Sequence, residues 1–142
     1  MRSGGQMLFN IYDAQDFKNL RSDVALKKAT QKYISNNPLN YSILNVGDVV
    51  GIYVPSSGHH YEVLAKGDTY NTHVGVVVGK DANGQPIIEH TVGGNVYQDP
   101  INNIRGSKYG KAAVTAAARP RYQHIPQIKL NSSATSNFIL DP

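Results

Sequence analysis

The chain has 142 residues, the usual length of one domain and enough to bury a hydrophobic core. It contains no cysteine, which excludes disulfides and thiolate metal sites, and no apolar run approaches the roughly 18 residues of a membrane span. The net charge of +4 suits an anionic partner, but the basic residues are not interleaved with aromatic ones as on a nucleic-acid platform. Neither nucleic acid nor a membrane is therefore an expected partner.

Two helices are predicted in the N-terminal part of the chain. Residues 5–18 place apolar side chains at helical spacing on one face. A second helix begins at Ser22 or Asp23, both of which are good N-cap residues, and ends before Pro38 because proline cannot continue the hydrogen-bond ladder.

After Gly47 the pattern changes to short β segments. The predicted strands are 48–54, 74–78, 87–92 and 112–118. The sequence Asp81-Ala82-Asn83-Gly84 is a turn signal between the second and third strands, and Pro86 fits the first position of a strand. We therefore predict an α+β fold in which N-terminal helices pack on a small antiparallel sheet.

Three stretches lack a periodic pattern. Residues 55–71 and 93–111 are predicted to be irregular connections. Residues 121–142 carry scattered apolar side chains, which is typical of an extended C-terminal arm that follows a domain at 1–120. Such an arm would dock on its own core or on a neighbouring protein subunit, and a frayed tail would show the same pattern.

Two histidines, His73 and His90, flank the hairpin made by the second and third predicted strands. A catalytic imidazole needs a fixed position and a partner on its second ring nitrogen that selects its tautomer. The two rings would be directly opposite, with Cβ atoms about 5 Å apart, if paired residue numbers sum to 163. A two-residue turn at Asn83-Gly84 gives a sum of 167 and separates them by about 13 Å. Only the first register, or a bulged relative of it, makes a contact, and the sequence leaves the register open.

Three segments follow one another in this region: GDVVGIY at 47–53, HVGVVVG at 73–79 and IEH at 88–90. In this order they resemble the NlpC/P60 family of papain-like cell-wall peptidases, and the related CHAP amidase/peptidase family shares much of the pattern. The resemblance covers about half the chain, from Gly47 to Arg119. It implies a papain-like site with a cysteine at the start of the first helix, His73 as the base and His90 as the residue that orients it. The implied substrate is the peptide part of peptidoglycan, and no cofactor is expected.

The cysteine that the resemblance requires is missing. Aligning the Cys-Ser-Gly of NlpC/P60 proteins places Arg2 at the cysteine and keeps Ser3-Gly4, whereas aligning the CHAP-like Gly-Gln-Cys places Met7 there. Neither an arginine nor a methionine side chain can attack a carbonyl group. Ser3 carries a hydroxyl group, but it needs a strong base and an oxyanion hole to act as a nucleophile.

The segment GHHYE at 58–62 is the densest cluster of metal-capable side chains. Together with His73 or His90 it would supply three ligands to a zinc ion, but adjacent histidines rarely ligate together from a strand and no HExxH motif is present. We therefore predict that this loop borders a substrate cleft next to His73 and binds no metal. The residues expected to border the cleft are His59, His60, Asp48 and Tyr70.

Two functions fit these observations. The first is a peptidoglycan-peptidase-like domain that is catalytically defective for lack of cysteine and has a structural or cell-wall-binding role. A bacteriophage tail is one setting, since wall-peptidase domains of this type occur there. The second is an active cell-wall hydrolase whose nucleophile is Ser3 or comes from another chain segment. The expected partners are peptidoglycan or, through the C-terminal arm, other protein subunits.

Overall fold

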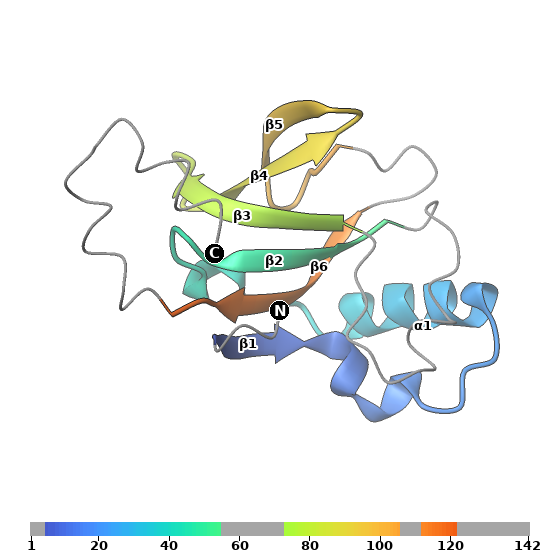
Figure 1. Cartoon of the computed structure of the whole chain (residues 1–142). Coiled ribbons are helices and arrows are strands. Elements are labelled where there is room, and N and C mark those ends of the chain that lie inside the picture. The colour runs from blue at the N-terminus through green and yellow to red at the C-terminus, as the bar shows by residue number, and fades with distance from the viewer. Residues whose placement is uncertain (1–4, 55–72, 106–111, 122–142) are drawn as a thin grey trace.

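One six-stranded antiparallel sheet organises the computed structural model, which describes residues 5–54, 73–105 and 112–121 (Figure 1). The order across the sheet is β1-β6-β2-β3-β4-β5. The strands are β1 (Gln6–Asn10), β2 (Val49–Tyr53), β3 (His73–Lys80), β4 (Pro86–Val92), β5 (Asn95–Pro100) and β6 (Ala113–Arg119). The described ranges contain one α-helix, α1 (Asp23–Asn36), so the predicted α+β class is confirmed.

Helix α1 begins and ends where the sequence predicts. The Ser22 hydroxyl accepts the backbone N–H of Ala25, which satisfies one of the free donors of the first turn. At the other end the backbone N–H of Asn37 donates to the carbonyl of Tyr33, and Pro38 follows. Within the described residues, none of the helical segments combines the length and apolarity needed to cross a bilayer.

The helix predicted for residues 5–18 is wrong. This segment forms β1, followed by two 3-10 turns over Ile11–Asp13 and Gln15–Phe17. Strand β1 pairs with β6, and the side chain of Asn10 then accepts the backbone N–H of Tyr12 to start the first turn. Short 3-10 turns can bury apolar residues at the same spacing as a helix. The pairing of β1 with β6 also outweighs the local helical preference of residues 6–10. The N-terminal part therefore contributes one helix to the sheet rather than two.

The two faces of the sheet bury different sets of residues because side chains alternate in direction along β2. Ile52 packs with Ile88 in the core on one face. Tyr53 packs with Leu26 of α1 in the core on the other face. His73 pairs with Ile52 and so belongs to the face that α1 does not cover. In Figure 1 the helix lies beside the β1–β6 side of the sheet, away from the β4–β5 hairpin.

The turn between β3 and β4 forms at the predicted residues. Gly84 has φ +78°, and the Asp81 carboxylate accepts the backbone N–H groups of Asn83 and Gln85. Pro86 is the first residue of β4, as predicted, where its missing N–H does not interrupt the strand.

Strand β5 lies inside the stretch that the sequence analysis predicts to be irregular. Gly93 and Gly94 have φ +58° and +83°, values that glycine adopts without strain. Val92 pairs with Asn95, so these two glycines form a two-residue hairpin turn. The Gly-Gly pair was the sequence signal for this strand, and the prediction overlooked it.

Gly75 lies in β3 on the face that holds Ile52, where the packing leaves no room for a side chain. A Cβ atom there would lie 2.5 Å from Cγ2 of Ile88 and 3.1 Å from the carbonyl oxygen of Glu89. We expect Gly75→Ala to lower the free energy of unfolding by about 1–3 kcal/mol, because the core must shift to admit the methyl group. Urea unfolding followed by circular dichroism measures this change.

Gly79→Ala, in the same strand, is the matched control. A Cβ atom at Gly79 meets no other atom within 4 Å. We expect its effect on the free energy of unfolding to stay within about 0.5 kcal/mol. Equal losses for the two variants would contradict the packing argument.

Candidate active site

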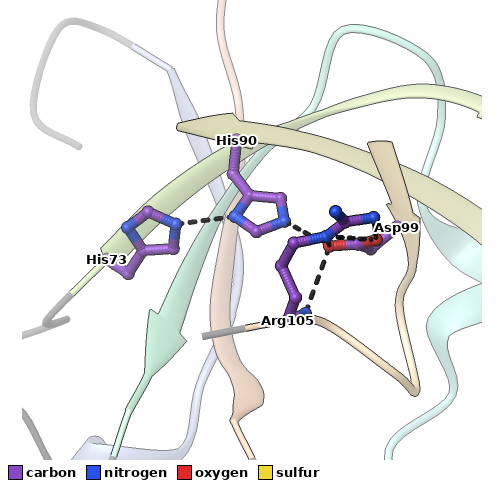
Figure 2. Close-up of polar contacts among 4 residues, drawn as sticks. All are labelled: His73, His90, Asp99 and Arg105. Carbon is purple, nitrogen blue, oxygen red and sulfur yellow. Dashed lines mark hydrogen bonds and ion pairs between the residues drawn. The ribbon is translucent and has the colours of Figure 1, made fainter. Parts of the chain in front are cut away.

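His73 and His90 are in hydrogen-bond contact. His73 begins β3 and His90 lies in β4, and Nε2 of His73 is 2.8 Å from Nδ1 of His90 (Figure 2). The two rings are nearly perpendicular, with an interplanar angle of 82°. His90 is buried and His73 is half-buried, so one ring of the pair reaches the surface.

The register of β3 and β4 explains this contact. Next to the histidines the paired residue numbers sum to 165, as for Val76 opposite Glu89, and this value lies between the two registers considered from the sequence. The register shifts between Val77 and Gly79, which marks a bulge. Continued by one pair, the register places His90 opposite the residue at position 75. The histidines are therefore diagonal neighbours on one face of the sheet.

Asp99 extends the histidine pair to a chain of three side chains. It lies in β5 opposite Ile88, and its Oδ2 is 2.7 Å from Nε2 of His90. The side chain of His90 is fully buried, and that of Asp99 is 7% exposed. We refer to His73, His90 and Asp99 as the relay. Asp99 is not among the residues predicted from the sequence, because β5 is not predicted and only the pairing of β5 with β4 brings this carboxylate to His90.

Arg105 binds both carboxylate oxygens of Asp99. Its Nε lies 3.0 Å from Oδ1 and 2.9 Å from Oδ2, and its Nη2 lies 2.8 Å from Oδ1. Its backbone N–H also donates to Oδ2 at 3.1 Å. The guanidinium stacks on Tyr97, with Cζ 3.9 Å from the ring centroid. The Arg105 side chain is half-exposed, but Asp99 binds the edge of its guanidinium and the Tyr97 ring packs against its face.

These contacts set the charges of the site. Hydrogen bonds from Arg105 hold the pKa of Asp99 well below its ordinary value of 3.8, although burial acts in the opposite direction. Burial lowers the pKa of His73 below its ordinary value of 6.5, and the neighbouring His90 lowers it further. At neutral pH Asp99 is therefore ionised and His73 is neutral.

The hydrogen-bond partners also assign the tautomers of the two rings. Ionised Asp99 can only accept, so His90 donates from Nε2 and, when neutral, carries a lone pair on Nδ1. His73 then donates from Nε2 to that lone pair and keeps its own lone pair on Nδ1. The relay thus presents Nδ1 of His73 as an oriented, unprotonated base, which is the state that general-base catalysis requires.

Within the described residues no hydroxyl or thiol group is hydrogen-bonded to His73, whose polar partner there is His90. Ser3 and Arg2 lie outside those residues. Met7 lies in β1, and β6 and β2 separate that strand from β3. The alignment that placed Met7 at a helix start beside His73 is therefore wrong, because no helix forms there.

Asp48 has a structural role away from His73, contrary to its predicted place in the cleft. It is 1% exposed and directly precedes β2, whereas His73 pairs with Ile52 near the far end of that strand. Arg119 binds both oxygens of the Asp48 carboxylate at 2.9 Å, and Oδ2 also accepts the backbone N–H of Asn45 at 2.7 Å. The other predicted cleft residues, His59, His60 and Tyr70, lie outside the described residues.

The described part of the chain contains no group of three or more His, Cys, Asp or Glu side chains placed to hold a metal ion. The relay does not form such a group, because Nε2 of His73, both ring nitrogens of His90 and the Asp99 carboxylate are hydrogen-bonded to one another. The loop at 58–62, on which the zinc alternative depended, lies outside the described residues.

Comparison of the chain with protein-family models, with curated proteins and with solved structures finds no match. The geometry and chemistry of the relay therefore carry the functional conclusion.

The lowered pKa of His73 predicts a pH dependence of stability. The unfolded chain takes up a proton at His73 near pH 6.5, whereas the folded protein does so only at lower pH. The contribution of His73 is therefore fully present above pH 6.5 and is lost as the pH falls from there through the folded-state pKa. We expect the difference in free energy of unfolding between wild type and His73→Gln to shrink over this range, as measured by urea unfolding at a series of pH values.

Glutamine is the suitable replacement because its amide N–H can still donate to His90. Subtracting the two curves removes the contributions of groups that do not interact with His73, including the loss that Asp99 causes below pH 3.8. A difference that is constant with pH, or that grows as the pH falls, would show that His73 is not desolvated as described.

Proposed function

We propose that this chain is a peptidoglycan-peptidase-like domain of the NlpC/P60 type, on a papain-like scaffold, in which His73 occupies the position of the general base. The relay is the observation that carries the proposal. His73 is bound to His90 at 2.8 Å, and His90 is bound to Asp99 at 2.7 Å. The resemblance assigns His73 the role of base and His90 the role of orienting residue, and the hydrogen bonds of the relay support both roles.

The order of the strands supports the same proposal. Strand β2, which follows Gly47-Asp48, lies next to β3, which begins at His73, and β3 lies next to β4, which carries His90. The three segments that carry the resemblance are therefore neighbours in space as well as in sequence.

Without a thiolate, this site is suited to binding a peptide rather than to cleaving it. The lone pair on Nδ1 of His73 can accept a hydrogen bond from an amide N–H of a stem peptide. No group among the described residues offers the electron pair for attack on a carbonyl carbon at that position. The function that the site supports best is recognition of the peptide part of peptidoglycan, in a structural or wall-binding role.

The burial of the relay favours a second candidate, a hydrolase with a hydroxyl nucleophile. Burying an ionised carboxylate and an imidazole lowers the stability of the fold relative to an apolar pair of the same size. A domain that only binds a peptide gains nothing from this loss of stability. In such a hydrolase Nδ1 of His73 would take the proton of a hydroxyl such as that of Ser3 as its Oγ bonds to the carbonyl carbon. His73 would then return the proton to the amine as the C–N bond breaks, and a water molecule would hydrolyse the resulting acyl ester.

Incubation of the full chain with purified bacterial sacculi tests both candidates. We expect the wild-type protein to sediment with the sacculi and to release no stem-peptide fragments detectable by mass spectrometry. His73→Ala should weaken binding by about 2- to 10-fold, the equivalent of one hydrogen bond. Val74→Ala is the matched control, because Val74 is the next residue of β3, is 54% exposed and points to the opposite face.

Release of fragments by the wild type, but not by His73→Ala or Ser3→Ala, would replace the binding function with the hydrolase. If the wild type neither binds sacculi nor releases fragments, both candidates fail.

A further inference from the structure

We infer that Arg105 is a positioning residue of the relay: by holding both carboxylate oxygens of Asp99 it neutralises the charge behind His90 and leaves His73 free to accept a proton. This inference deepens the proposed function, because it rests on His73 acting as the base of the site. It concerns a residue that does not contact His73 and that the sequence analysis did not single out.

The geometry makes Asp99 a carboxylate with two competing partners. His90 approaches Oδ2 at 2.7 Å, and the Nε of Arg105 approaches the same oxygen at 2.9 Å. Arg105 also holds Oδ1 from Nε and Nη2. Its guanidinium cannot turn away without losing its stacking on Tyr97. Asp99 therefore directs a hydrogen-bond acceptor at His90 but presents little net negative charge to it.

The charge balance decides which protonation state the relay favours. An uncompensated carboxylate 2.7 Å from His90 would stabilise a proton on the two imidazoles, and His73 would then be occupied by a proton and unable to act as a base. With Arg105 in place, the carboxylate and the guanidinium together are close to neutral. They therefore give little electrostatic stabilisation to an additional proton on the two imidazoles. Arg105 thus leaves the tautomers of both rings fixed, while it cancels the attraction that the Asp99 carboxylate would exert on a protonated His73.

Among the described elements that surround the relay, no further charged side chain faces it and affects its protonation. Strand β2 contributes Ile52 opposite His73, β4 contributes His90, and β5 contributes the Tyr97 ring beside His90. Glu89 points to the opposite face of β4, where it accepts a hydrogen bond from Gln98.

Nitrogen-15 NMR titration of the histidine rings in the full chain measures this effect without any assay of activity. The His73 signal is identified by its loss in His73→Gln. We expect Arg105→Gln to raise the pKa of His73 by about 1 to 3, because Asp99 becomes an uncompensated anion. Asp99→Asn should lower it, since Arg105 becomes an uncompensated cation, and the double variant should lie close to wild type.

Arg119→Gln is the matched control. Arg119 also binds both oxygens of a buried aspartate, Asp48, and its loss changes the net charge by the same amount. No histidine is bonded to Asp48 in the described structure, so the pKa of His73 should stay at its wild-type value in this variant. A purely structural Arg105 would lower the melting temperature on substitution and leave the pKa of His73 unchanged, which would overturn the inference.

If Arg105→Gln alone does not fold, the comparison of Asp99→Asn with the double variant decides. The inference requires the pKa of His73 to be higher in the double variant than in Asp99→Asn, and equal values would overturn it. The outcome is separable from the proposed function. If the wild type does not bind sacculi but the pKa values of His73 follow the expected order, only the proposed function is contradicted. If the wild type binds sacculi but the pKa of His73 does not change in Arg105→Gln, only the role of Arg105 is contradicted.

Discussion

The candidate site depends on the position of one carboxylate, that of Asp99. It is ionised because Arg105 binds both of its oxygens, and an ionised carboxylate in this position makes His90 a donor from Nε2. That donation fixes the tautomer of His90, which in turn fixes the tautomer of His73. The tautomer of His73 is therefore set by a group two hydrogen bonds away. A buried charge so placed is tolerable only because each of its lone pairs has a partner.

The sheet separates the structural and chemical tasks of the fold. Helix α1 and the 3-10 turns complete an apolar core on the face to which Tyr53 points. The relay occupies the other face, at the end of a second core that includes Ile52 and Ile88. In the part of the chain that the structure describes, arginines bind two buried aspartates, Asp48 and Asp99, and these differ in their further partners. Asp48 accepts the backbone N–H of Asn45 and fixes the entry to β2, whereas Asp99 accepts a hydrogen bond from His90 and fixes the orientation of its ring.

The sequence predicted the local elements better than the long-range ones. Helix α1 and the central strands were recognisable because caps, turns and apolar alternation act over a few residues. β1 was mistaken for a helix, since its apolar spacing fits both structures and only the pairing with β6 selects the strand. β5 is not predicted, although Gly93-Gly94 is a hairpin signal, and without this strand Asp99 cannot be identified as a partner of His90. The contact between His73 and His90 stayed open because a bulge, which has no sequence signature here, sets the register.

Residue pattern alone predicts an α+β fold without cysteine, with two histidines on adjacent strands. Residue types and their local spacing suffice for that, because they act within one helix or one hairpin. Strand pairing across the sheet is needed to explain why the two imidazoles touch, why Asp99 and Arg105 complete their environment, and why Asp48 lies apart from them. Those relations join strands through register and pairing across the sheet, where a shift of one residue turns a side chain to the opposite face.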